Sequence, residues 1–134
     1  MPNDNNHYVI TLDDTITAHE IIIIVSGGRS GVLNESNLLS AISRPYCGYF
    51  SSLSEKAAVL MEALIQNHGF VDGNKRSAVF LSLTMIRLSG FDVLPLNPKD
   101  DVDLQIEDMA VALAEGRINS EDICAWLTPR LKPI

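Results

Sequence analysis

Residues 52–90 decide the fold of this chain, and they read SLSEKAAVLMEALIQNHGFVDGNKRSAVFLSLTMIRLSG. Ser52 and Glu55 form the capping box S-x-x-E, which predicts the start of a helix. The apolar residues after it recur at helical spacing, and the same spacing places His68 at the inward end of the stripe Ala57, Leu60, Met61, Leu64 and Ile65. A second helix is predicted from about Asn74 to Ser89, with Ala78, Leu81, Met85 and Leu88 in phase and Gly90 after its end.

The sequence on either side of this pair is also typical of helices. We predict further helices at about 13–25, around Leu38 to Ile42, at about 100–115, and from Ser120 to a stop at Pro129. Residues 8–12 alternate as a short strand or an extended lead-in. The predicted fold is therefore all-α, a compact bundle of about six helices, with 1–7 as a flexible N-terminus and 8–134 as one domain. His7 falls in that flexible end, and His19 is expected on a helix face or at the edge of the core, with a role in a site as the alternative.

Composition excludes several classes of protein. The chain has 134 residues, of which 46% are apolar and 20% charged, as in an ordinary globular domain. Its net charge of −7 argues against nucleic acid or an anionic membrane as a partner. The aliphatic run Ile21 to Val25 is far shorter than the ~20 residues that span a bilayer. The N-terminus lacks the pattern of a signal peptide, and the two cysteines form no CxxC pair, so we expect a cytoplasmic protein with free thiols.

The residues best suited to catalysis or ligand binding lie in the loop between the two central helices. Residues 61–90 contain three basic and two acidic residues, whereas the segments on both sides are net negative. Lys75 and Arg76 fall at a helix start, where backbone amides attract anions and where cations oppose the helix dipole. From the residues alone, His68 is a general base or a core histidine, and Asp72 is an ion-pair partner or a ligand for Mg²⁺. The Lys-Arg pair is a phosphate site or a solvated face.

A second unusual segment precedes the first central helix. Tyr46, Tyr49 and Phe50 place three of the eight aromatic residues within five positions. They either cover an edge of the core or form an exposed loop that docks a peptide or a base.

Residues 68–76 resemble the signature of the Fic/Doc superfamily, and most closely the pattern H-x-F-x-[DN]-[AG]-N-K-R of its death-on-curing (Doc) branch. All seven fixed positions match, namely His68, Phe70, Asp72, Gly73, Asn74, Lys75 and Arg76. The glycine-rich segment Gly27 to Gly31 and the pair Arg44-Pro45 are also similar, so the resemblance covers roughly Tyr8 to Gly90.

The resemblance implies a Fic fold with a site for ATP and Mg²⁺ at this loop. By position, His68 would be the general base on a target hydroxyl, Phe70 would anchor the loop in the core and Asp72 would bind Mg²⁺. The phosphates would lie in a cradle made by Gly73, Asn74, Lys75 and Arg76. The loop from Pro45 to Leu53 would be the flap that aligns the target peptide, which favours a docking role for Tyr46, Tyr49 or Phe50.

Two departures from the Fic type bear on the reaction. Fic adenylyltransferases carry H-x-F-x-[DE]-G-N-G-R-x-x-R, whereas this chain has Lys75 at the second glycine and Val79 at the last arginine. The resemblance to Doc therefore implies transfer of the γ-phosphate by a serine/threonine protein kinase, with elongation factor Tu as the target and translation arrest as the effect. The alternatives are an adenylyltransferase or other nucleotidyltransferase, and a catalytically idle Fic-like binding module.

Control of the activity is expected to come from a second protein. An internal inhibitory motif [ST]-x-x-x-E-[GN] is not present, because Ser51 to Glu55 is followed by Lys56. The resemblance to Doc toxins implies a cognate antitoxin whose C-terminal segment folds into a groove near the flap.

Overall fold

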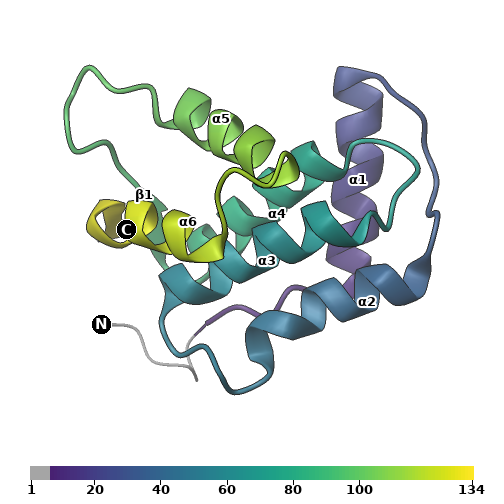
Figure 1. Ribbon diagram of the computed structural model, residues 1–134, viewed down its shortest axis with the longest axis horizontal. Helices are drawn as coiled ribbons and strands as arrows, with labels where there is room; N and C mark the ends of the chain where they lie inside the picture. Colours follow the sequence, from purple (N-terminus) through teal and green to yellow (C-terminus); the bar gives the residue numbers. More distant parts are fainter. Residues whose placement is uncertain (1–6) are drawn as a thin grey trace.

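The computed structural model describes residues 7–134, and six α-helices form the body of this part of the chain (Figure 1). They are α1 (Leu12–Ser26), α2 (Glu35–Ser43), α3 (Leu53–Asn67), α4 (Asn74–Leu88), α5 (Val102–Ala114) and α6 (Ser120–Leu127). Short 3-10 turns, η2 (Arg44–Tyr46) and η3 (Thr128–Arg130), follow α2 and α6. Strand β1 (Phe91–Val93) pairs antiparallel with β2 (Leu131–Pro133). The prediction of an all-α domain of about six helices is confirmed.

Helix α3 is the central element of the domain, because it packs against α2, α4, α5 and α6 (Figure 1). Its capping box is present as predicted, with the Ser52 hydroxyl accepting a hydrogen bond from the Glu55 amide at 3.1 Å. Residues that are apolar and fully buried fill the contact between α3 and α4, among them Ala57, Leu60, Leu64, Leu81 and Met85. The α3–α4 pair therefore supplies about half of the buried apolar residues and holds the loop between the two helices.

Two charged side chains of α3 are buried, and each ties a distant segment to the helix. The Lys56 ammonium lies 2.9 Å from Nδ1 of His7, which is only 6% exposed. The prediction of a frayed His7 is therefore wrong, because this contact draws the residue against α3; residues 1–6 lie outside the described part of the chain. On the opposite side, Glu62 accepts a hydrogen bond from the Ser120 amide at 2.7 Å and so fixes the start of α6.

Helices α1 and α6 also begin with capping boxes, which the sequence pattern did not identify. Thr11 and Asp14 form a capping box at the start of α1, and Asn119 with Asp122 forms one at the start of α6. Each helix start has several polar residues in a row, so the sequence pattern alone does not single out the cap. The extended lead-in before α1 is held by a hydrogen bond from the Tyr8 amide to the Ser89 hydroxyl, 2.8 Å long.

Leu88 was predicted to be in the core and is instead 58% exposed. At 100° per residue, Leu88 lies about 80° around the helix from Ala78, which puts it at the edge of the buried stripe. It is also the last residue of α4.

Among residues 7–134 no helix has both the length and the apolar content that crossing a membrane requires. Cys47 and Cys124 are free thiols, as predicted.

Two alanine substitutions on α4 test this packing. Met85→Ala leaves a cavity in the α3–α4 contact and is expected to lower the free energy of unfolding by about 2–5 kcal/mol. Leu88→Ala on the same helix is expected to change it by less than about 0.5 kcal/mol. Chemical denaturation followed by circular dichroism measures both free energies of unfolding. Equal losses in the two variants would contradict the assignment of Met85, and not Leu88, to the buried face of α4.

Candidate functional site

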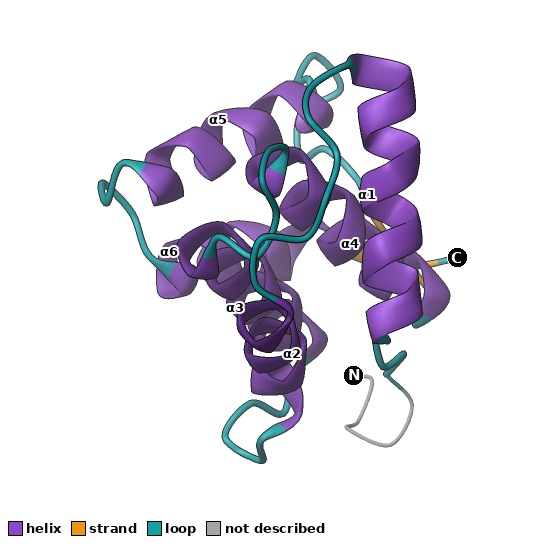
Figure 2. Cartoon of the chain, turned by 90° about the vertical axis from the view of Figure 1, so that its right-hand side faces the viewer, coloured by secondary structure: helices purple, strands orange, loops and turns teal. Residues whose placement is uncertain are grey.

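The loop of residues 68–73 is held against the connection between α1 and α2. The Val71 amide donates to the Gly31 carbonyl at 3.1 Å, and the amides of Leu33 and Asn34 both donate to the Gly69 carbonyl. Figure 2 shows the two segments near the centre of the view, both drawn in teal. Residues 27–34, which the sequence identified only as a glycine-rich turn, therefore form one wall of the candidate site.

Phe70 anchors the loop in the core. Its side chain is 1% exposed, and its ring stacks on that of His19 with 3.8 Å between centroids and 2° between planes. The Asn74 side chain accepts a hydrogen bond from the Phe70 amide and donates one to the Phe70 carbonyl, both 3.0 Å long. Asn74 was predicted to contact phosphate, but its amide group is taken up by the loop itself, which leaves the backbone N–H of Asn74 for an anion.

Helix α4 begins without a side-chain cap. Its N-cap is Gly73, which adopts the left-handed conformation with φ 76° and offers no side chain to the amides of the first turn. Those amides, from Asn74 to Arg76, have no acceptor within the helix, as at any helix start. Uncapped amides and the positive end of the helix dipole make this turn suitable for a phosphate group.

Gly28 is required for the connection to approach the site. A Cβ at this position would lie 2.7 Å from Oδ2 of Asp72 and 3.0 Å from Nη2 of Arg76. The glycine also has φ 113°, which other residues rarely adopt. This functional position was missed by sequence reasoning, because a glycine-rich turn does not reveal which glycine faces which side chain.

The Asp72 carboxylate is oriented by backbone amides on both oxygens. Its Oδ2 accepts a hydrogen bond from the Arg29 amide at 3.1 Å, and its Oδ1 accepts one from the Gly73 amide at 2.8 Å. These hydrogen bonds, first that of Arg29 and then that of Gly73, hold the pKa of Asp72 below its ordinary value, and the charges of Arg76 and Arg29 add to the effect. The carboxylate is therefore ionised at neutral pH.

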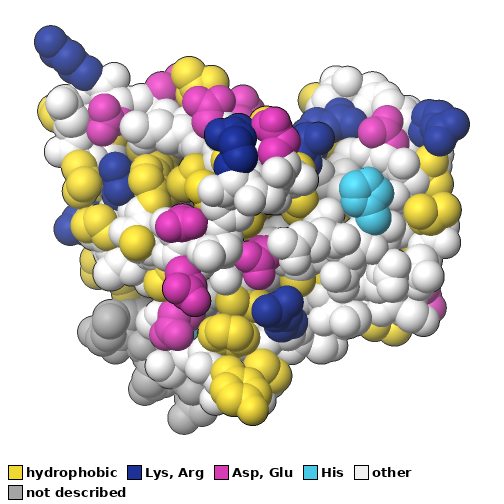
Figure 3. Space-filling view, viewed as in Figure 1, with side chains coloured by type: hydrophobic (Ala, Val, Ile, Leu, Met, Phe, Trp, Pro, Cys, Tyr) yellow, Lys and Arg dark blue, Asp and Glu magenta, His cyan; other side chains and the backbone are white. Residues whose placement is uncertain are grey.

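His68 is exposed, not at the inward end of the α3 stripe as predicted. The helix ends at Asn67, and His68 adopts the left-handed conformation with φ 51°, which turns its side chain away from the core. Its Nδ1 lies 3.3 Å from the Ile65 carbonyl, so Nδ1 carries the proton of this hydrogen bond and Nε2 is the nitrogen able to accept one. On the face of the molecule shown in Figure 3 a histidine side chain, drawn in cyan, lies open at the surface.

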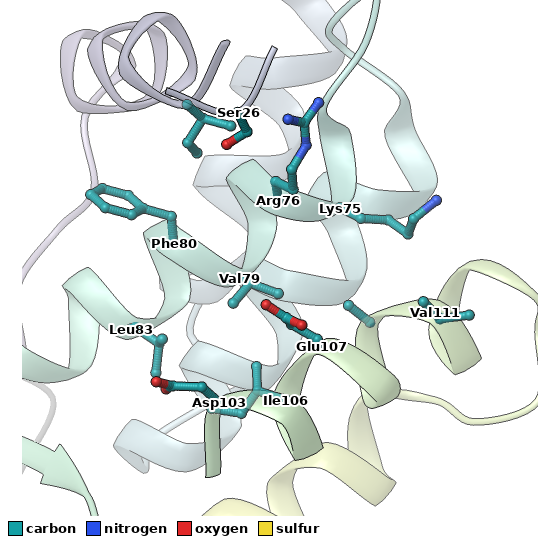
Figure 4. A pocket seen from close by; sticks show the side chains of 12 residues that line it. Ser26, Lys75, Arg76, Val79, Phe80, Leu83, Asp103, Ile106, Glu107 and Val111 are labelled. Carbon is teal, nitrogen blue, oxygen red and sulfur yellow. The ribbon is translucent and has the colours of Figure 1, made fainter. Parts of the chain in front are cut away.

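Lys75 and Arg76 stand at one end of a cavity of about 450 Å³ between α1, α4 and α5 (Figure 4). Lys75 is exposed, and Nη1 of Arg76 donates to the Gly27 carbonyl at 3.0 Å. Val79 lies farther along the same wall, and Asp103 and Glu107 of α5 face it across the cavity. No sequence pattern indicated this wall, because α5 reaches it only through the tertiary fold.

The segment predicted to be the flap, Pro45 to Leu53, runs from η2 to the start of α3, and its three aromatic residues differ in their surroundings. The Tyr46 hydroxyl accepts a hydrogen bond from the Ile10 amide and donates one to the Tyr8 carbonyl, so this residue covers the core edge. Tyr49 is 86% exposed. Phe50 is partly buried and lines a shallow pocket with Glu55 and residues of α6. Only Tyr49 presents its ring openly to a partner, whereas Tyr46 is engaged within the domain.

This chain is similar to known proteins over most of its length. The model of the family described as Fic/DOC matches residues 9–86, which include α1 to α3, the loop and all but the last two residues of α4. A protein named Toxin Doc from Mycolicibacterium smegmatis is 32% identical to this chain over 120 residues, which is 86% of this chain and 87% of that protein.

The hydrogen bonds to Asp72 predict how the fold responds to acid. Because the folded-state pKa is lowered, the carboxylate contributes stability above its ordinary pKa of 3.8, and this contribution is lost as the pH falls through the lower folded value. In carboxyl-detected NMR, Asp72 is expected to titrate with a midpoint below 3.8. The stability difference between the wild type and Asp72→Asn should shrink over the same range. A midpoint at or above 3.8 would contradict the assigned hydrogen bonds.

Proposed function

The chain belongs to the Fic/DOC family, and on this premise we propose that it is the toxin of a toxin–antitoxin module and acts as a protein kinase. The proposed reaction transfers the γ-phosphate of ATP to a serine or threonine hydroxyl of a translation factor, with elongation factor Tu as the expected target. The observation that carries the proposal is the exposed imidazole of His68, whose Nε2 can accept a proton, at the loop that ends in the uncapped start of α4.

In this proposal His68 is the general base and the start of α4 is the phosphate cradle. Nε2 of His68 takes the proton of the target hydroxyl, and the oxygen then bonds to the γ-phosphorus of ATP. The bond from that phosphorus to the β-phosphate oxygen breaks, and ADP leaves. The backbone amides of Asn74 to Arg76 and the charges of Lys75 and Arg76 would neutralise the phosphate oxygens, whereas the Gly73 amide, predicted for the same role, already donates to Asp72. Arg76 is suited to this role because a hydrogen bond to the Gly27 carbonyl holds its guanidinium in place.

The residues at the loop suit Mg²⁺ held together with a nucleotide. Mg²⁺ is usually bound by one or two carboxylates together with substrate phosphates and water. Asp72 supplies one ionised carboxylate, and residues 7–134 contain no group of three or more metal-ligating side chains. Asp72 would therefore hold the ion, which would neutralise charge on the phosphates when bound.

Phosphate transfer is favoured over adenylyl transfer by the two departures from the Fic pattern. Lys75 extends its charged side chain at the first turn of α4, where a glycine would leave room for a nucleotide. Val79 presents an apolar surface to the cavity where an arginine would bind phosphate. Adenylyl transfer from the same loop is the second candidate, since His68 and Asp72 serve either reaction. An idle binding module would not need the orientation that backbone amides impose on Asp72.

Control by an antitoxin is supported by the apolar surface beside the site. Phe80 and Val111 are 46% and 42% exposed and both line the cavity between α1, α4 and α5, and adjacent exposed apolar side chains are typical of a surface that binds a partner. We propose that a helical segment of the antitoxin covers this surface, in place of the groove near the flap that the resemblance implied, with basic residues placed against Asp103 and Glu107.

Labelled ATP distinguishes the candidate reactions. The purified protein is incubated with elongation factor Tu or a cell extract and with ATP that carries the label on either the α- or the γ-phosphate. Label on protein from the γ-position alone is the expected result, and label from the α-position would favour nucleotidyl transfer. His68→Ala should abolish transfer and growth arrest while its circular dichroism spectrum stays unchanged. Without transfer from either position and without growth arrest by the wild type, both enzymatic functions are rejected.

Lys75→Glu is expected to separate stability from function. An acidic residue at the positive end of α4 should leave the free energy of unfolding unchanged or raise it by about 0.3–1 kcal/mol. The same change should weaken ATP binding by about tenfold or more, because it replaces a phosphate-binding cation. Arg87→Glu in the last turn of α4 is the matched control, and it should destabilise the fold without affecting ATP binding. Isothermal calorimetry measures ATP binding and thermal denaturation measures stability. Unchanged ATP binding by Lys75→Glu would show that Lys75 does not bind the phosphates.

A further inference from the structure

His19 makes two contacts with the loop that the proposed reaction does not use. It lies on α1, far from the motif in sequence, and is only 2% exposed. One contact is the stack of its ring on Phe70, and the other joins its Nε2 to the backbone carbonyl of Asp72 over 2.7 Å. A carbonyl oxygen only accepts hydrogen bonds, so Nε2 of His19 is the donor.

The hydrogen bond from His19 fixes the peptide unit that joins Asp72 to Gly73. A peptide unit is planar and trans, so its C=O and N–H point in opposite directions. With the carbonyl held by His19, the N–H of Gly73 points the other way, and it donates to Oδ1 of Asp72 at 2.8 Å. The hydrogen bond from His19 therefore sets the direction of the Asp72 carboxylate and of the Gly73 amide, which precedes α4.

We propose that His19 is a positioning residue for binding of Mg²⁺ and nucleotide. It does not touch the substrate; it acts through the Asp72–Gly73 peptide, which aims the metal-binding carboxylate and the amides of the phosphate cradle. This inference rests on the proposed function, because it assumes that Asp72 and the start of α4 bind Mg²⁺ and phosphate. It goes beyond the motif, which contains no residue of α1.

Two substitutions separate the ring of His19 from its hydrogen bond. His19→Phe keeps an aromatic ring over Phe70 but has no donor for the Asp72 carbonyl. His19→Gln loses the stack but keeps an N–H donor on a side chain of similar reach. Thr15→Val is the matched control, because Thr15 is buried on the same helix one turn earlier and bonds only to the Thr11 carbonyl. A role confined to packing would make His19→Gln the more harmful change, whereas a positioning role makes His19→Phe the more harmful one.

Binding of Mg²⁺ with a non-hydrolysable ATP analogue, measured by calorimetry, is the test, with thermal denaturation as a check of folding. We expect His19→Phe to weaken binding by about 10- to 100-fold, as loss of a partner that orients a metal ligand typically does. His19→Gln and Thr15→Val should stay within about threefold of the wild type. A folded His19→Phe that binds like the wild type overturns the proposal, and so does a His19→Gln that binds as weakly as His19→Phe.

The remaining outcomes are also decisive. If His19→Phe does not fold, His19→Gln decides alone, since binding within about threefold supports the proposal and a tenfold loss overturns it. If the wild type itself does not bind Mg²⁺ and the analogue, the proposed function fails first, and the inference fails with it. Because the readout is binding, it does not depend on whether the reaction transfers a phosphate or a nucleotidyl group.

Discussion

The geometry of the site depends on the burial of the Phe70 side chain in the core. A loop can be drawn into a core only if its backbone polar groups keep their hydrogen bonds, and the side chain of Asn74 meets that need by bonding to both the amide and the carbonyl of Phe70. The stack of His19 on the Phe70 ring then joins the loop to α1. With the middle of the loop fixed, His68 and Asp72 project from its two sides, and neither could be aimed if Phe70 were free.

Local stability and chemistry conflict at this loop. His68 is a non-glycine residue in the left-handed conformation, which is locally unfavourable. Lys75 and Arg76 oppose the dipole of α4, and Gly73 leaves the helix uncapped. The packing of α3 against α4 compensates for these features, because the apolar contact between the two helices is buried along nearly its whole length. Such conflicts concentrate where a protein performs its function, and here they concentrate in six consecutive residues and the first turn that follows.

Sequence reasoning succeeded where the interactions are local. The capping box Ser52–Glu55 and the apolar period of α3 involve residues within one or two turns, so the pattern predicts the helix directly. It failed where a side chain is directed by a distant segment. The periodicity placed His68 inward because it assumed that the helix continues. The family resemblance favoured a docking role for Tyr46, Tyr49 or Phe50, because it could not foresee the hydrogen bonds of the Tyr46 hydroxyl to residues 8 and 10.

The sequence by itself determined the family, the helical class and the identity of the residues that carry charge at the loop, because these are properties of a short contiguous motif and of local periodicity. Only the tertiary structure decided which way those residues face. The amide of Arg29 orients the Asp72 carboxylate, and His19 holds the backbone carbonyl of Asp72. Gly28 allows the backbone after α1 to approach the side chains of Asp72 and Arg76 closely. Arg29, His19 and Gly28 belong to α1 and the connection after it, and they meet the loop only because α1 packs against α4.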